Sequence, residues 1–158
     1  MISLLNKYYI YNTWFNLVLF SVPHIMKHWY HANIEQKTEQ NSNFREVLYT
    51  GEHLQLVLMS LLPGEEIGLE THHENDQFFR VESGEGKCEI NGNFYTLGVW
   101  SALVIPAKAK HNISNTSQTQ SLKMYTIYTP PHHKDWIVRA TKQEAIDNGA
   151  EFDGKTTE

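Results

Sequence analysis

Four side chains in two separated segments have the donor atoms and the spacing to bind one metal ion. Glu70 and His72 lie two residues apart, Gln77 follows shortly after them, and His111 comes much later in the chain. Together these residues offer a carboxylate oxygen, two imidazole nitrogens and an amide oxygen. Two imidazoles and one carboxylate form a donor set that suits Fe(II), Mn(II), Ni(II) or Zn(II). If Glu70 and His72 face inward, a divalent metal ion would meet all four donors, and the sequence does not decide which metal.

The alternation of side chains along a strand decides which histidines can share this site. Residues 70 and 72 point to one side of a strand, so His73 must point to the other. We expect His72 and His111 to lie close together inside the protein, either as ligands or as hydrogen-bonded pocket histidines without a metal. His73, His132 and His133 are expected on the outer face or in solvated loops.

The other two candidate ligands also have structural interpretations. The Glu70 carboxylate could pair with Lys108 or Lys110 at the rim of the site instead of binding a metal. The Gln77 amide is a neutral and weaker donor, so it could instead orient a water molecule or a substrate.

Short β-branched and aromatic runs, separated by turn residues, must position these side chains. Asn91-Gly92 lies between two alternating runs, and both residues tolerate the positive φ that a two-residue hairpin needs. The pattern is typical of an all-β fold, a small antiparallel β-barrel or jelly roll with its ligand site at the mouth. The predicted strands are Arg45–Tyr49, Leu54–Leu61, Gly68–His72, Gln77–Glu82, Lys87–Ile90, Phe94–Leu97, Ser101–Ile105, Asn112–Asn115 and Leu122–Thr129.

Two of these runs, Leu54–Leu61 and Leu122–Thr129, are apolar on both faces. A strand with one solvated face should alternate, so the second face of each run must be covered. The cover could come from the N-terminal segment, from a helix or from a second subunit, which makes a homodimer one of the possibilities.

Both ends of the chain differ from the strand-rich middle. Residues 1–25 contain an apolar run that is too short to span a bilayer, and no signal-peptide cleavage pattern follows it. We interpret these residues as an N-terminal extension, either a loosely packed appendage or a start-codon artefact, and a membrane anchor is the less favoured alternative. At the other end, Thr141 and Glu144 have the spacing of a helix capping box, which predicts one short C-terminal helix ending at Asn148-Gly149. The polar tail after Phe152 is expected to be mobile.

The composition excludes several classes of function. The 158 residues carry a formal net charge of −5 without a dense basic run, so a nucleic-acid partner is not expected. The sequence lacks the glycine-rich motifs of dinucleotide and triphosphate sites. Its single cysteine, Cys88, allows no intrachain disulfide and no cysteine-based zinc cluster. These features favour a cytoplasmic protein with no membrane partner.

The residues around the four candidate ligands resemble the two motifs of the cupin superfamily. The first segment reads G-x5-E-x-H-x4-Q-x6-G from Gly64 to Gly84, and the second reads P-x4-H-x3-N from Pro106 to Asn115. Cupins hold one divalent metal ion through two histidines, a glutamate and a third histidine inside a small barrel. The resemblance implies that the corresponding four positions of this chain are the metal ligands.

This chain departs from the cupin pattern at four positions. Glu70 stands where the family has its first histidine and Gln77 where it has its glutamate, so the carboxylate has moved within the donor set. Trp100 and Lys108 replace two glycines of the second motif. A narrower similarity, to small bacterial cupins of the mannose-6-phosphate isomerase-like group, begins near Met26. It implies a single cupin domain over residues 26–158, with a barrel core at about 44–131.

The resemblance implies a small-molecule ligand in the barrel and leaves three functions open. The first is a metal-dependent, isomerase-type enzyme acting on a small polar, sugar-like molecule, in which the metal polarises a carbonyl or hydroxyl group and Glu70 moves a proton as a catalytic residue. The second is an Fe(II)-dependent dioxygenase, which needs two imidazoles, a carboxylate and open coordination positions. The third is a non-enzymatic sugar-binding or sensing module.

We predict that residues 1–25 are dispensable, because the composition changes and the family similarity begins near Met26. A chain that starts at Met26 should keep the melting temperature and the metal content of the longer chain. Both can be measured on the purified proteins by thermal unfolding and by elemental analysis. A large loss of either property would mean that the segment packs into the domain.

Overall fold

The computed structural model describes residues 28–158, and the proposed extension at residues 1–25 lies outside them. No helix of this described part is long and apolar enough to cross a membrane. Its elements, in chain order, are α1 Ile34–Gln40, β1 Arg45–Thr50, β2 Gln55–Leu61, β3 Asp76–Ser83, β4 Gly86–Ile90, β5 Asn93–Leu97, β6 Ala102–Ile105, β7 His111–Asn115, β8 Leu122–Thr129, β9 Val138–Arg139 and α2 Lys142–Asp147.

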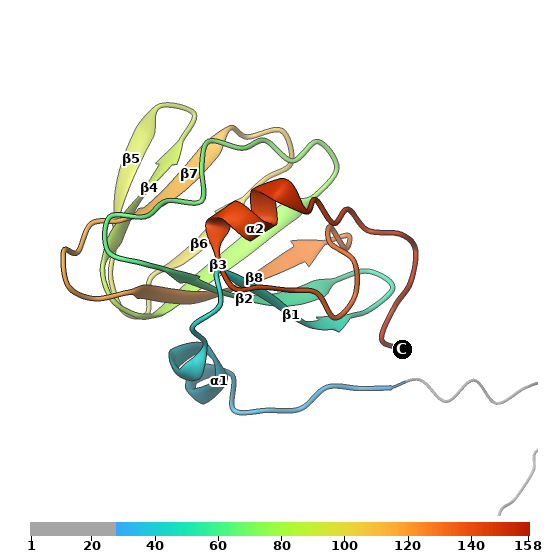
Figure 1. Ribbon diagram of the computed structural model, residues 1–158. Helices are drawn as coiled ribbons and strands as arrows, with labels where there is room; N and C mark the ends of the chain where they lie inside the picture. The colour runs from blue at the N-terminus through green and yellow to red at the C-terminus, as the bar shows by residue number, and fades with distance from the viewer. Residues whose placement is uncertain (1–27) are drawn as a thin grey trace, which may run out of the picture.

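Two antiparallel sheets form the body of the protein (Figure 1). The larger sheet has the strand order β6-β3-β8-β2-β1-β9, and the smaller sheet has the order β5-β4-β7. Strands far apart in the chain pair closely, since β8 lies between β2 and β3. The tight hairpin between β4 and β5 turns at Asn91 and Gly92, with φ values of 48° and 82°. The all-β antiparallel jelly-roll fold predicted from the sequence is therefore confirmed.

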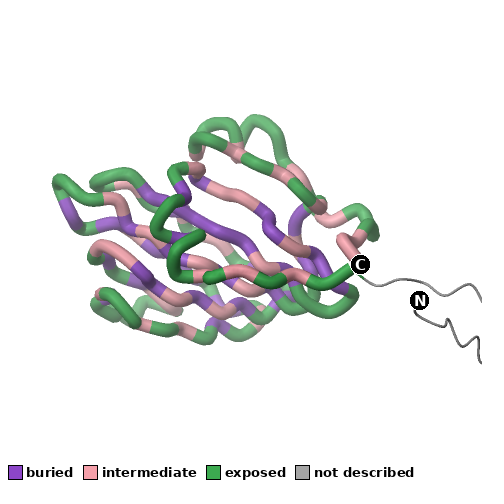
Figure 2. The backbone as a smooth tube through the Cα atoms, turned by 90° about the horizontal axis from the view of Figure 1, so that it is seen from below, coloured by how far each residue is buried: buried purple, intermediate pink, exposed green. Residues whose placement is uncertain are grey.

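Alternation along the strands gives the large sheet an inner face that changes from apolar to polar along its length. At one end, Leu61 of β2 pairs with Leu122 of β8. At the other end, Gln55 pairs with Tyr128, and Tyr128 pairs with Gln77 of β3. All five side chains are buried, and Figure 2 shows such buried stretches running along the strands while the turns are exposed. A polar end of the barrel interior is thus built from ordinary strand residues.

Helix α1 lies on the outer face of the large sheet, where it contacts β3 and β8 (Figure 1). The Asn33 side chain caps it by accepting the N–H of Gln36 at 3.0 Å, and Thr38 faces the sheet as a buried residue. A helix is therefore one cover of the apolar second face, as the pattern of β8 requires. This helix is not among the predicted elements, although Asn33 before a run of good helix formers is a usable N-cap signal.

The predicted C-terminal helix is present as α2, with a modified cap. The Thr141 hydroxyl oxygen accepts the N–H of Glu144 at 3.2 Å, as a capping box requires. The Glu144 carboxylate accepts the N–H of Ala140 at 2.8 Å, and not that of Thr141. The helix therefore begins as predicted, while the return bond of the box is displaced by one residue.

The tail after Phe152 was expected to be mobile, but in the structure it is hydrogen-bonded to the barrel. Thr157 donates its backbone N–H to the Thr50 carbonyl at 2.7 Å, and its hydroxyl oxygen accepts the Thr50 N–H at 2.9 Å. Phe152 donates its N–H to the carbonyl of His132 at 3.0 Å. The polar composition of the tail suggested mobility, but its backbone instead completes the hydrogen bonding of β1 and of the loop after β8.

The predicted strand Gly68–His72 is wrong as a regular strand, because a bulge interrupts it. Ile67 donates its N–H to the carbonyl of Ile113, whereas Glu70 and His111 exchange both backbone hydrogen bonds at 2.9 Å. The three residue steps from Ile67 to Glu70 therefore lie opposite only two residue steps of β7, from Ile113 to His111. Gly68 takes up the difference with φ +106°, a backbone conformation that L side chains rarely adopt.

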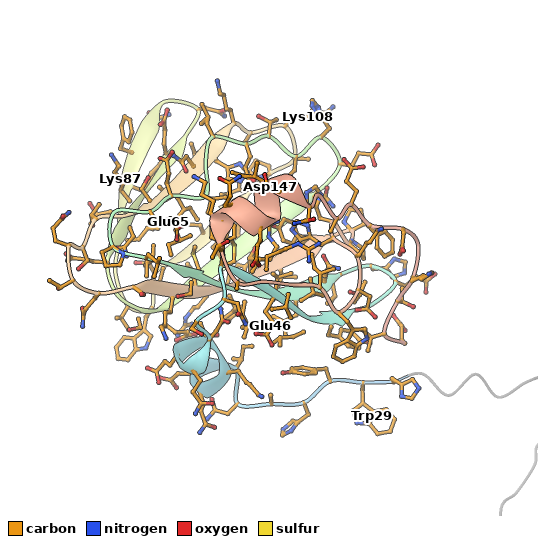
Figure 3. The ribbon with its side chains drawn as sticks, in the orientation of Figure 1. Trp29, Glu46, Glu65, Lys87, Lys108 and Asp147 are labelled. Atoms are coloured by element: carbon orange, nitrogen blue, oxygen red, sulfur yellow. The ribbon has the colours of Figure 1, made fainter. Side chains whose placement is uncertain are left out.

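Trp100 and Lys108, which replace two glycines of the cupin pattern, both have left-handed backbone conformations. Their φ angles are 70° and 71°. Glycine adopts such angles without the steric cost that a Cβ atom brings, which explains why the pattern has glycine there. Lys108 also donates its N–H to the His72 carbonyl at 2.6 Å, and it lies at the rim of the barrel in Figure 3. The strained turn thus holds the loop that carries His72.

Replacing Lys108 by glycine should stabilise the protein. Lys108→Gly relieves the strain of the left-handed backbone. This gain in free energy exceeds the cost of ordering the more flexible glycine, so we expect the free energy of unfolding to rise by about 0.5–1 kcal/mol. Urea denaturation measures the change. Lys110→Gly is the matched control, because Lys110 is also exposed but has an ordinary φ, and it should be destabilising. Equal losses in both variants would show that the turn at Lys108 is not strained.

Candidate metal centre

Glu70, His72 and His111 bring their donor atoms together at the polar end of the barrel interior. One carboxylate oxygen of Glu70, Oε1, lies 3.2 Å from His72 Nε2 and 3.4 Å from His111 Nε2. The three donor atoms all lie within 4.8 Å of one another. His73 is exposed. The expectation that His72 and His111 meet inside the protein while His73 points away is confirmed.

Backbone pairing places two of these side chains. Glu70 and His111 form a directly opposed antiparallel pair, so their side chains stand on the same face of the small sheet. His72 follows two residues later and is held by the hydrogen bond from Lys108 to its carbonyl. The exposed fractions are 26% for the Glu70 side chain, 8% for His72 and 1% for His111, so the centre opens to solvent on the Glu70 side.

Gln77 reaches the same centre from the opposite sheet. Its amide oxygen lies 3.1 Å from His111 Nε2, and its amide nitrogen donates to the Thr126 hydroxyl at 3.1 Å. The hydrogen bond to Thr126 turns the oxygen, not the nitrogen, toward the imidazole. All four predicted residues are therefore brought together, with Gln77 contributing a neutral oxygen.

The arrangement of lone pairs fits a bound cation. His111 Nδ1–H donates to the Ala109 carbonyl at 3.0 Å, so in the neutral ring Nε2 carries a lone pair. That lone pair faces two acceptor oxygens, one from Glu70 and one from Gln77. Three lone pairs directed at one point repel each other unless a proton or a metal ion lies among them. A backbone carbonyl that fixes the imidazole tautomer is also a usual outer partner of a metal-binding histidine.

The hydrogen bonds at the centre favour an ionised Glu70 carboxylate. Burial raises the pKa of the Glu70 carboxyl, but hydrogen bonds from His111 and His72 outweigh burial and hold this pKa well below its ordinary value. Burial lowers the pKa of His111, and the hydrogen bond to Glu70 reverses this, so the pKa of His111 is raised. Among the ion pairs of the described residues, none joins Glu70 to Lys108 or Lys110. In the structure Glu70 therefore pairs with the two histidines and not with a lysine at the rim.

The expectation that His132 and His133 are solvated is wrong, because both pack into the wall of the centre. The His132 ring lies 4.3 Å from the His72 ring and stacks on Tyr128 at 5.1 Å between ring centres. His133 is 6% exposed and contacts both His132 and Tyr128. Burial lowers the pKa of His132 to about 4, and it also lowers the pKa of His133 well below its ordinary value. The wall is thus neutral and aromatic.

The buried side chain of Gln55 holds this histidine wall in place. Its amide nitrogen donates to the His133 carbonyl at 2.7 Å and to the Thr50 hydroxyl at 2.9 Å. Its amide oxygen accepts the N–H of His133 at 2.8 Å. A polar residue at the start of an otherwise apolar inner strand was the available sequence signal for this role, since a buried amide needs partners.

Cys88 takes no part in the centre. It is fully buried on β4, and burial raises its pKa to about 11. A thiol that stays protonated at neutral pH is a poor nucleophile and a poor metal ligand. In the structure Cys88 is a small, buried strand residue.

Comparisons with known proteins support the fold. A family described as the cupin domain matches residues 57–128. The uncharacterised protein YrkC of Bacillus subtilis is 46% identical over 122 residues, which are 73% of this chain and 64% of YrkC. The chain thus spans just under two thirds of the length of that relative.

Solved structures also resemble the fold of this chain. A crystal structure of a Bacillus halodurans protein shares 40% identity and superposes with a TM-score of 0.74, over 78% of this chain and 97% of that one. A cupin of Shewanella frigidimarina, described as RmlC-like, is 18% identical with a TM-score of 0.51, over 55% of this chain and 75% of its own. At that identity the likeness concerns the fold alone.

We predict that Glu70→Gln weakens metal binding far more than Gln77→Ala. The first change removes the carboxylate of the donor set, and we expect the dissociation constant for Mn(II) or Fe(II) to rise by about a hundredfold or more. The second removes a neutral donor that water can replace, so about tenfold or less is expected. Titration of each metal-free variant measures both. Wild-type affinity in Glu70→Gln would remove Glu70 from the proposed ligand set.

Gln77→Glu is the complementary variant. It restores the residue that cupins usually have and adds a second carboxylate, so we expect tighter binding of a divalent ion. Without metal, the new buried carboxylate faces Glu70, and the metal-free protein should unfold at a lower temperature than the wild type. Weaker binding together with unchanged stability would show that position 77 does not face the ion.

Proposed function

The chain belongs to the cupin superfamily, and on this basis we propose that it is a metal-dependent enzyme acting on a small polar molecule inside the barrel. One divalent ion would be held by Glu70, His72 and His111, with Gln77 as a weaker fourth donor. The observation that carries the proposal is the convergence of one carboxylate oxygen and two imidazole nitrogens within 4.8 Å. A single ion per chain and a cytoplasmic location are parts of the same proposal.

The side chains around the centre have separable roles. When bound, a divalent ion supplies Lewis-acid polarisation of a substrate carbonyl or hydroxyl oxygen. The Ala109 carbonyl orients His111, and the Thr126 hydroxyl orients Gln77, so two of the four donors are positioned before any ligand binds. The neutral rings of His132 and Tyr128 form a wall that shields one side of the centre from water.

The exposure of the candidate ligand side chains indicates the side from which a substrate enters the centre. His111 is almost fully buried and Glu70 is partly exposed, so a ligand approaches from the Glu70 side. Protein donors occupy at most four positions, and six-coordinate metals such as Mn(II) and Fe(II) therefore keep room for a substrate with two adjacent oxygen atoms. This favours an isomerase-type reaction on a sugar-like molecule, whose neighbouring carbonyl and hydroxyl oxygens can bind side by side. The earlier assignment of Glu70 as the proton carrier stays a prediction.

A second candidate function is supported by the donor set itself. Two histidines and one carboxylate with open positions are also the set of Fe(II)-dependent oxygenases. Metal identity and oxygen uptake separate the two: bound Mn or Zn without oxygen consumption supports the isomerase, and Fe(II) with oxygen consumption supports the dioxygenase. A chain that binds sugars but no metal would instead be the non-enzymatic sugar-binding module.

The metal content of histidine variants tests the shared part of both functions. We expect about one divalent ion per wild-type chain, and loss of most of it in His72→Ala and His111→Ala, because each removes an imidazole donor. Elemental analysis after purification in metal-supplemented buffer provides the measurement. His73→Ala is the matched control, since this neighbouring histidine is exposed, and it should keep the wild-type content. Equal metal content in all three variants would refute the site.

A further inference from the structure

Arg45 places a permanent positive charge on the inner face of the barrel. It begins β1 and pairs directly with Met59 of β2, which is fully buried in the core between the sheets. Directly opposed residues of an antiparallel pair share a face, so Arg45 also points inward. Its guanidinium carbon lies 5.6 Å from the ring centre of Phe44, which supports the side chain from one side.

Arg45 is half-buried, and its guanidinium group lacks the partners that a cation in a protein interior normally has. Its Nε atom is buried and makes no hydrogen bond. The ion pairs among the described residues do not include Arg45, so no carboxylate of residues 28–158 lies in direct contact with its charge. Five N–H donors in a planar fork suit a carboxylate or a phosphate group, which accepts two of them at once.

His133 adds a second orphaned donor or acceptor beside this charge. Its Nε2 atom is buried without a partner, although the residue is only 6% exposed. After burial itself, the positive charge of Arg45 is the strongest influence that lowers the pKa of His133, and the same charge acts on His132 and Tyr128. Backbone geometry places Arg45 and His133 on the same side of the barrel: Val47 donates its N–H to the Ile137 carbonyl at 2.9 Å, and Gln55 joins His133 to Thr50, so the segment that carries His133 runs beside β1. Through its contact with His132, which packs on His72, His133 also adjoins the candidate metal centre.

The balance of charge in the barrel also favours an anionic ligand. A bound divalent ion would bring two positive charges, of which Glu70 offsets one, and Arg45 adds another. Excess positive charge away from water is costly unless a ligand compensates it. A small molecule that carries an anionic group would supply both the missing negative charge and the missing acceptors for Arg45.

Starting from the proposed function, we infer that Arg45 and His133 form an anion-binding subsite of the same barrel, so that the bound molecule carries a carboxylate or a phosphate group. Arg45 receives this group with its planar fork, and the neutral His133 ring donates or accepts one further hydrogen bond. The polar remainder of the molecule then faces Glu70, His72 and His111. The subsite sets the substrate class and does not itself require the metal.

A series of three-carbon probes tests this subsite. Glycerol, glycerate and glycerol 3-phosphate have similar size and differ in charge, and their binding to the metal-loaded full chain can be measured by isothermal titration calorimetry. We expect the wild type to bind at least one of the two anions about tenfold more tightly than glycerol. Arg45→Gln should abolish this preference and leave the affinity for the metal unchanged.

Arg80→Gln is the matched control. Arg80 lies on the outer face of β3, 3.5 Å from Glu82, and its Nε is likewise buried without a hydrogen bond. This variant should bind the anions as the wild type does. If Arg45→Gln is too unstable to assay, Arg45→Lys keeps the charge but loses the planar fork, and it should retain only part of the preference.

The same titrations on metal-free protein separate the subsite from the proposed function. A wild type that takes up no metal but still prefers the anions through Arg45 would refute the metal-dependent function and support the subsite. An unchanged preference in Arg45→Gln, or a wild type without any preference for the anions, would overturn the subsite.

Discussion

The two backbone hydrogen bonds between Glu70 and His111 are the contact on which the candidate centre depends. They hold the two residues as a directly opposed pair and thereby turn both side chains to one face. The bulge at Gly68 sets this register, since a slip by one residue would bring Leu69 inward and turn Glu70 to solvent. Backbone pairing therefore assembles a carboxylate and an imidazole lone pair that, without a cation, would not associate by themselves.

The polar end of the barrel is stable because nearly every buried polar group has a defined partner. The Gln55 amide hydrogen-bonds through its nitrogen to Thr50 and through both its nitrogen and its oxygen to the loop after β8. The Gln77 amide nitrogen donates a hydrogen bond to the Thr126 hydroxyl. Such networks are favourable only when complete, because each unpaired buried group costs free energy. Against this background, the unpartnered nitrogens of Arg45 and His133 stand out as the places where the network is unfinished.

Period-two alternation and turn residues predict eight of the nine expected strands to within one residue, because these signals depend on neighbours in the chain. The resemblance to the cupin motifs groups Glu70, His72, Gln77 and His111 at one centre, and the local rules turn His73 away from it. They fail for Gly68–His72, where a bulge replaces the regular ladder, and for His132 and His133. The burial of those histidines is decided by Gln55, which lies 78 residues from His133, and no local pattern contains such a contact.

The tail after Phe152, bound to Thr50, has a consequence for the order in which the barrel assembles. The bond between Thr50 and Thr157 joins residues 107 positions apart, and the bonds from Gln55 to His133 close a loop of 78. The Asn91-Gly92 hairpin, by contrast, closes within its own two strands. Long loops cost more chain entropy to close, so local hairpins form early and long-range contacts late in folding. The histidine wall is then among the last parts to close, after the sheets that carry Glu70 and His111 are already in place.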